Sequence, residues 1–118
     1  MAANTEPIFS KNGKIGSVLV TAANTSSQGG GTIGTDIFLA FTADATNGSF
    51  IRQVRFIVTA TTANTASTAT VGRVFISSVT SGATTSANTF MIAEITLPSL
   101  TADSSTAGAS YIDIPLGF

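Results

Sequence analysis

The side chains that could carry out acid, base or nucleophilic chemistry are few and scattered in this sequence. It contains no histidine and no cysteine, which excludes imidazole catalysis, Ser-His and Cys-His nucleophile pairs, thiolate metal sites and disulfides. The 6 carboxylates stand singly between Glu6 and Asp113, and scattered carboxylates usually lie on solvated strand faces or cap turns. We therefore expect a protein that is not an enzyme and that has no cofactor, no bound metal and no small-molecule substrate.

The glycine-rich run GGGTIG at residues 29–34 matches the G-x-G-x-x-G pattern of dinucleotide-binding loops. That function needs a strand before the run and a helix after it, because the helix N-terminus holds the pyrophosphate. Here a polar loop precedes the run and a predicted strand follows it. We interpret the run as a flexible turn.

The segment DATNG at residues 44–48 has a faint likeness to a calcium-binding loop. It lacks the alternating D-x-[DN]-x-[DN]-G ligands and the later bidentate glutamate of such loops. Asn-Gly is favoured in two-residue hairpin turns, where both residues adopt positive φ. The sequence therefore predicts a hairpin turn at Asn47 and Gly48.

The charge content argues against nucleic acid and membranes as partners. The formal net charge is −1 and only 9% of the residues are charged, against about 25% in an average soluble domain. Arg52 and Arg55 would point to opposite faces of one strand, so they are expected in salt bridges or interface contacts. A hydroxyl-rich surface of low charge packs against another protein at little desolvation cost.

Targeting signals are not visible in the sequence. The opening MAANTEPIF has neither a basic start nor an apolar run of signal-peptide length. No later apolar stretch approaches the ~18 residues that a membrane-spanning helix requires. We expect a chain that is made and folded in the cytoplasm.

Short runs rich in Ile, Val, Phe and Thr, each bounded by turn residues, predict strands throughout the chain. No window carries the apolar spacing of an amphipathic helix, whereas Met91 to Leu97 alternates with the period of two of a half-buried sheet. The pattern predicts an all-β chain, an antiparallel β-sandwich of jelly-roll type over residues 15–118. The expected strands are Ile15 to Thr21, Asp36 to Thr42, Phe50 to Ala60, Val71 to Val79, Thr89 to Leu97 and Tyr111 to Leu116.

The stretch Thr59 to Thr70 contains only Thr, Ala, Asn and Ser, between two strong strand signals. It is either an ordered loop or an extension of both strands into a long hairpin, and the stiffness of threonine favours the hairpin. The edges of such nearly uncharged strands would pair with other chains unless another subunit covers them. We therefore expect a homo-oligomer, a trimer in preference to a dimer, with Thr61, Thr62, Asn64, Thr65 and Thr68 at the contact.

Residues 1–14 form a separate unit in this interpretation, an extended N-terminal arm. Pro7 fixes an extended backbone and lacks an N–H, and the isolated pair Ile8-Phe9 is too irregular for a core strand. The arm is either a disordered tail or a fastener that binds a partner, and we favour the fastener. Its predicted contact residues are Pro7, Ile8, Phe9, Lys11 and Lys14.

Several segments resemble a group of small β-rich proteins that are associated with the heads of tailed bacteriophages. They are MAANTEPIFSKNGKIGSVLVTAANTSSQGGGT, FTADATNGSFIRQVRFIVTAT, ATVGRVFISS and MIAEITLPSL, which together cover most of the chain. These are patterns of strand and turn and not a catalytic signature. Head decoration or cement proteins of this kind are jelly-roll sandwiches that sit as trimers, sometimes dimers, on the outer capsid.

The resemblance implies a structural virion protein that clamps neighbouring major capsid subunits and so stabilises the outer surface of the shell. The partner would be the major capsid protein, and the location would be the outer surface of the virion. The alternative is a β-sandwich module of the tail or host-recognition apparatus that binds a surface carbohydrate or receptor. The lack of tryptophan and the small-residue loops favour the shell over the tail.

Overall fold

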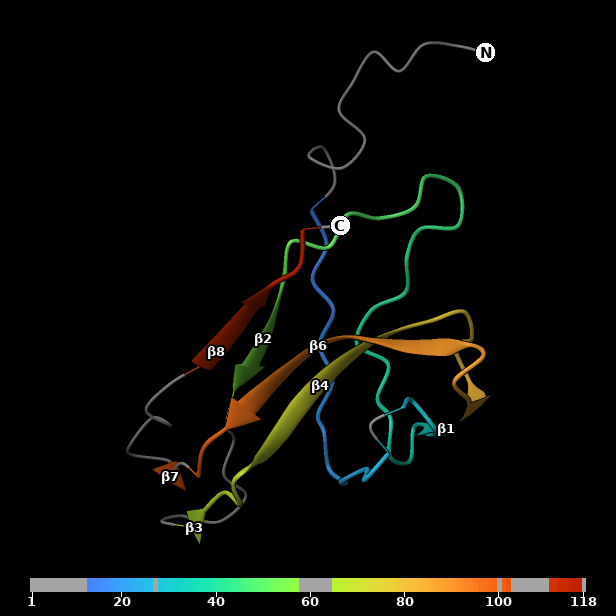
Figure 1. Cartoon of the computed structure of the whole chain (residues 1–118). Helices are drawn as coiled ribbons and strands as arrows, with labels where there is room; N and C mark the ends of the chain where they lie inside the picture. The colour runs from blue at the N-terminus through green and yellow to red at the C-terminus, as the bar shows by residue number, and fades with distance from the viewer. Residues whose placement is uncertain (1–12, 27, 58–64, 100, 103–110, 118) are drawn as a thin grey trace. The chain divides into compact units, whose positions relative to one another are not determined.

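All regular structure in the part of the chain that the computed structural model describes is β-structure. The described residues are 13–26, 28–57, 65–99, 101–102 and 111–117, and they contain no helix (Figure 1). This confirms the prediction of an all-β chain. The strands are β1 (Gly31–Ile33), β2 (Gln53–Ile57), β3 (Thr65–Ala66), β4 (Thr70–Ser77), β5 (Gly82–Thr84), β6 (Thr89–Leu97), β7 (Thr101–Ala102) and β8 (Tyr111–Pro115).

The strands pair in twos, as β1-β5, β2-β8, β3-β7 and β4-β6. The chain forms two compact units, one from Met1–Phe50 with Ser77–Phe90 and the other from Ile51–Ile76 with Met91–Phe118. The boundary predicted at residue 14, between an arm and a single sandwich domain, stays a prediction because residues 1–12 lie outside the described part.

The β2-β8 sheet of the second unit is antiparallel and has two different faces. Val54 lies opposite Ile114, and Phe56 lies opposite Ile112. These apolar residues are half-buried, whereas the alternate residues of β2 are exposed. Direct cross-strand apolar pairs of this kind are the unit of sheet stabilisation, and here they line the inner face.

The β4-β6 sheet packs against that inner face at a glycine. A Cβ built on Gly72 would lie 3.0 Å from a ring carbon of Phe56 and 3.0 Å from a methyl carbon of Leu97. Ile95 and Leu97 are half-buried while Glu94 and Thr96 are exposed, which confirms the predicted period of two from Ala93 to Leu97. The predicted alternation is wrong at Met91, which is exposed, and at Ile92, which is half-buried. The absent side chain of Gly72 therefore makes room for the aromatic ring of a strand in the other sheet.

The loop between β4 and β6 carries β5, which pairs with β1 in the first unit. The Ser78 N–H donates to the Asn88 carbonyl at 2.9 Å and closes the antiparallel hairpin of β4 and β6. Thr84 in β5 is 4% exposed and Thr89 in β6 is 1% exposed, so polar residues are among the most buried side chains. The Thr89 hydroxyl is satisfied by hydrogen bonds within this unit, to Ser77 and Asn88.

The glycine-rich run at residues 29–34 is ordered by such bonds. The Asn24 amide donates to the Gly30 carbonyl at 3.0 Å, and the Gly30 N–H donates to the Ser26 hydroxyl at 3.2 Å. The Asp36 carboxylate accepts the Thr32 N–H at 2.6 Å. The predicted turn is present, but β1 begins inside the run, and side chains from both flanks hold the backbone in place.

Two predicted strands are wrong. Ile15 to Thr21 and Asp36 to Thr42 have strand composition, yet neither belongs to a strand of the structure, apart from one bridge between Ile33 and Ile37. A Cβ built on Gly16 would clash with the Ala40 carbonyl oxygen, so the two segments pass closely without a hydrogen-bonded ladder. β-propensity describes how a residue fits a sheet and does not supply the partner edge.

The predicted long hairpin through Thr59 to Thr70 is also wrong in the pairing of the strands that flank it. β2 pairs with β8 and β4 pairs with β6, so the two strands that would form the hairpin are not paired with each other. Thr65 pairs with Ala102 in the short β3-β7 ladder. Residues 58–64 lie outside the described part of the chain.

Gly72→Val should destabilise the protein by about 1–3 kcal/mol, because the added methyl groups would overpack the contact with Phe56 and Leu97. Gly13→Val is the control, since no atom lies within 4 Å of a Cβ at that position. The free energies of unfolding can be measured by urea titration followed by far-UV circular dichroism, because the chain has no tryptophan for fluorescence. Equal stability of the two variants would contradict the proposed sheet contact.

Thr84→Val should leave stability unchanged or raise it. The Thr84 hydroxyl is buried and has no hydrogen-bond partner among the described residues, so valine removes an unsatisfied group and keeps the shape. Thr89→Val is the matched comparison. The Thr89 hydroxyl makes one hydrogen bond with the Ser77 hydroxyl and one with the Asn88 side-chain oxygen, at 2.9 Å each. This substitution should cost about 1–3 kcal/mol. A loss at Thr84 as large as that at Thr89 would show that the Thr84 hydroxyl has a partner.

Candidate functional site

Most of the residues that the sequence predicts at partner or oligomer contacts are outside the described part of the chain. Pro7, Ile8, Phe9, Lys11, Thr61, Thr62 and Asn64 lie outside the described residues. Lys14 and Thr68 are exposed, and Thr65 begins β3. Accessibility at Lys14 and Thr68 is compatible with contact to a partner, and the roles assigned to all these residues stay predictions.

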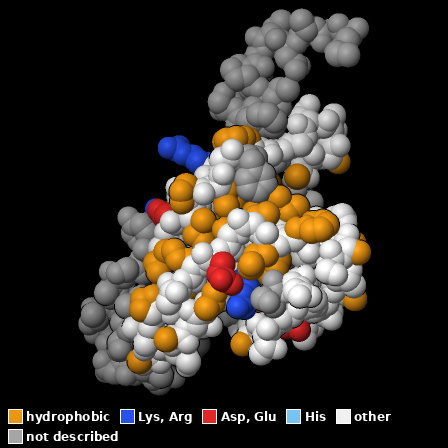
Figure 2. All heavy atoms as spheres, in the orientation of Figure 1, with side chains coloured by type: hydrophobic (Ala, Val, Ile, Leu, Met, Phe, Trp, Pro, Cys, Tyr) orange, Lys and Arg blue, Asp and Glu red, His pale blue; other side chains and the backbone are white. Residues whose placement is uncertain are grey.

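Exposed apolar side chains are the main surface feature of the described residues, and many are visible in Figure 2. Isolated exposed apolar residues are ordinary on soluble proteins, but a run of them indicates an interaction surface. The large apolar residues that are more than a third exposed are Ile15, Val18, Leu19, Val20, Leu39, Phe50, Ile57, Val71, Ile76, Phe90 and Met91.

One run of this kind is the segment IGSVLV, residues 15–20. Ile15 is 98% exposed and Leu19 and Val20 are 62% and 61% exposed. No backbone hydrogen bond joins residues 15–21 to another residue in the described ranges. A charge-free, β-prone segment with free N–H and C=O groups is a template for pairing with another chain. We call residues 15–20 the unpaired segment.

A second surface feature is an ion pair between β2 and β8. The Arg55 guanidinium donates to both carboxylate oxygens of Asp113, at 2.6 and 2.8 Å, and the two residues are directly opposite in the ladder. This hydrogen bonding from Arg55 holds the pKa of Asp113 below its usual value. The pair holds the register of strands that are far apart in the sequence.

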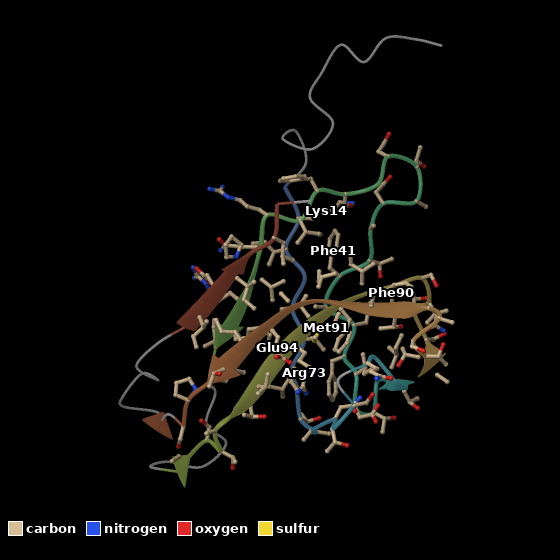
Figure 3. All side chains as sticks on the ribbon, in the orientation of Figure 1. Lys14, Phe41, Arg73, Phe90, Met91 and Glu94 are labelled. Atoms are coloured by element: carbon tan, nitrogen blue, oxygen red, sulfur yellow. The ribbon has the colours of Figure 1, made fainter. Side chains whose placement is uncertain are left out.

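The second ion pair joins β4 and β6. The Arg73 guanidinium donates to the Glu94 carboxylate at 2.8 Å, and Figure 3 shows the two side chains together over these strands. Of the two expectations for Arg55, a salt bridge or an interface contact, the structure shows the salt bridge, and Arg73 forms a second one. The sequence contained a usable signal for the second pair, because each residue is the single charge within an apolar strand run.

The Asp44 turn is a local structure and not a ligand site. The Asp44 carboxylate accepts the N–H groups of Asn47 and Thr46 at 2.8 and 3.0 Å, and these bonds lower its pKa. The Gly48 N–H donates to the Asp44 carbonyl at 2.9 Å. The predicted hairpin turn is therefore wrong in type, because the turn spans one more residue and joins no pair of strands.

The described residues offer neither a metal-binding cluster nor a membrane-spanning helix. No group of three or more acidic, histidine or cysteine side chains is placed to hold a metal ion among the residues that the structure describes. The described residues also include no helix long and apolar enough to cross a membrane.

Comparison with known proteins gives no match: no family model, no curated protein and no solved structure is significantly similar to this chain. Function must therefore be inferred from the residues and their placement. The candidate site that they support is a surface for binding protein, made of exposed apolar side chains with few charges.

Asp113→Asn should remove part of the acid sensitivity of folding. Because the pKa of Asp113 is lowered in the folded protein, its contribution to stability is present above the unfolded pKa of about 3.9 and is lost as the pH falls through the folded pKa. The stability difference between the wild type and the variant should shrink as the pH is lowered from 6 to about 2. Asp44 titrates equally in both proteins, so the comparison isolates Asp113. A difference that is constant with pH would contradict the assignment.

Proposed function

We propose that this chain is a structural virion protein that decorates the outer capsid of a tailed bacteriophage and clamps neighbouring major capsid subunits. In this proposal it folds as a jelly-roll sandwich with an extended N-terminal arm and acts without turnover. The exposed, unpaired segment at residues 15–20, directly after the predicted arm, is the observation that carries the proposal.

The sequence supports this proposal in two ways. The segments quoted above resemble those of head-associated phage proteins, and their turn and strand patterns extend over most of the chain. The chain also lacks histidine and cysteine and has only 9% charged residues, which suits a protein that binds protein surfaces and not one that turns over a substrate.

The structure supports a binding surface that starts at the arm and continues along the chain. Lys14 is exposed and is followed at once by Ile15, which is 98% exposed. An arm that binds a shell subunit would bring the unpaired segment beside the same partner, where its free N–H and C=O groups could add a strand to the shell protein. In this arrangement the arm provides anchors and the segment provides backbone hydrogen bonds.

The anchors in this proposal are Ile8 and Phe9. Each would contribute about 1.5–3 kcal/mol if fully buried, before the cost of ordering the arm. In a trimer, the second and third arms attach intramolecularly, so the assembly stays bound far longer than one arm would. A clamp of modest contacts can thus stabilise a shell when it is repeated at many equivalent positions.

The copy number of the chain in purified particles tests the function. A shell decoration protein should be present in hundreds of copies per particle, which quantitative mass spectrometry against the major capsid protein can measure. A count of a few or a few dozen would support the alternative tail or host-recognition module instead. Absence from particles would reject both.

Deletion of residues 2–14 tests the arm in the same particles. The truncated chain should fold but should be lost from particles during density-gradient centrifugation. The paired substitution Ile8→Ala with Phe9→Ala should have a similar effect, whereas Lys11→Ala with Lys14→Ala should have less, because the apolar anchors provide most of the affinity. Normal occupancy by the truncated chain would show that the arm is not the fastener.

A further inference from the structure

The outer face of the β4-β6 sheet has no role in the function proposed above. Arg73 contacts Glu94 across the two strands, so the odd-numbered residues of β4 and the even-numbered residues of β6 share this face around the ion pair. Nearer the loop the matching differs, because Ser77 hydrogen-bonds Thr89. Gly72 and Leu97 belong to the opposite face, which packs on Phe56. We call the set Val71, Arg73, Phe75, Ile92, Glu94 and Thr96 the outer face.

The outer face combines apolar side chains with a central ion pair. Val71 is 39% exposed, and Phe75 and Ile92 are half-buried. The side chain of Arg73 is 24% exposed and that of Glu94 is 47% exposed. An arginine held in a fixed geometry among apolar residues is typical of the centre of a protein interface.

The charges of the outer face are complementary to themselves. Arg73 lies on β4 and Glu94 lies on β6, so the face is positive over one strand and negative over the other. Two copies can be related by a two-fold axis that lies in the plane of contact, parallel to the strands and midway between them. It places β4 of one copy over β6 of the other, and therefore each Arg73 over the partner's Glu94.

The same operation matches the apolar residues. Because β4 and β6 are antiparallel, Phe75 lies on the same side of the ion pair as Ile92, and Val71 lies on the same side as Thr96. The two-fold axis then brings Phe75 of one copy and Ile92 of the other to the same end of the contact. A two-fold contact uses the same patch twice, so a face that is complementary to itself favours a second copy over an unrelated protein.

We propose that the outer face of the β4-β6 sheet is a two-fold interface with a second copy of this chain, in which two Arg73–Glu94 pairs combine into a closed network of four charges. The contact by itself gives a dimer, in contrast to the trimer expected from the sequence. It differs from the contact predicted at residues 61–68, and it does not depend on a capsid as partner.

Charge reversal tests the interface in the purified full chain. Arg73→Glu and Glu94→Arg should each abolish self-association, measured by light scattering, because each places like charges opposite one another. An equimolar mixture of the two variants should associate again, since an all-acidic face meets an all-basic one. The double exchange, Arg73→Glu with Glu94→Arg, should restore self-association.

The control is Arg55→Glu, which breaks the other cross-strand ion pair and should leave association unchanged. Circular dichroism checks that each variant is folded. If a reversal variant does not fold, Arg73→Gln and Glu94→Gln replace the two reversals, and each should raise the apparent Kd about tenfold or more. A monomeric wild type, self-association of the single reversals, or a mixture that remains monomeric would each overturn the proposal. Rescue in the mixture cannot come from stability within one chain, so it separates the interface from a merely structural ion pair.

Discussion

Pairing between strands that are distant in the sequence is the constraint on which the rest of the structure depends. β2 and β8 meet only after almost half of the chain has been bridged, since Arg55 and Asp113 are 58 residues apart in a chain of 118. Closing a loop of that length has an entropic cost before any contact is gained. The inner face that this pairing creates receives the β4-β6 sheet at Gly72, where a ring from β2 occupies the space of the absent side chain. Without β8 there would be no face to cover.

Four of the charged side chains in this chain hold strand pairs together. Arg55–Asp113 spans β2 and β8, and Arg73–Glu94 spans β4 and β6. Exposed ion pairs contribute little to stability on average, so their value lies in register, because a slip by one residue would move each partner to the other face. In a chain with 9% charged residues, this leaves long stretches of surface neutral. The same sparseness makes the surface easy to desolvate against another protein.

Some segments outside the strands have their backbone N–H groups hydrogen-bonded locally, and others do not. The glycine-rich run and the Asp44 turn satisfy their N–H groups locally, through Asn24, Ser26, Asp36 and Asp44. The unpaired segment at residues 15–20 has equal or greater strand propensity and no such bonds within the described residues. An exposed, strand-prone segment of this kind can add to the edge of a sheet in another chain.

The sequence by itself determined the class of structure and limited the kinds of chemistry that the side chains could perform. Strand composition with a period of two predicted β6 at its observed bounds and most of β2, β4 and β8, because local propensity and face alternation are encoded within each run. The absence of histidine and cysteine limited the catalytic possibilities without any coordinates. Only the tertiary structure decided which edges meet. Ile15 to Thr21 reads as a strand as clearly as Thr89 to Leu97 does, yet only the second finds a partner, since pairing depends on an edge supplied from elsewhere in the chain. For the same reason, the two cross-strand ion pairs could be suspected from single charges in apolar runs, but their partners became known only when the strands were placed side by side.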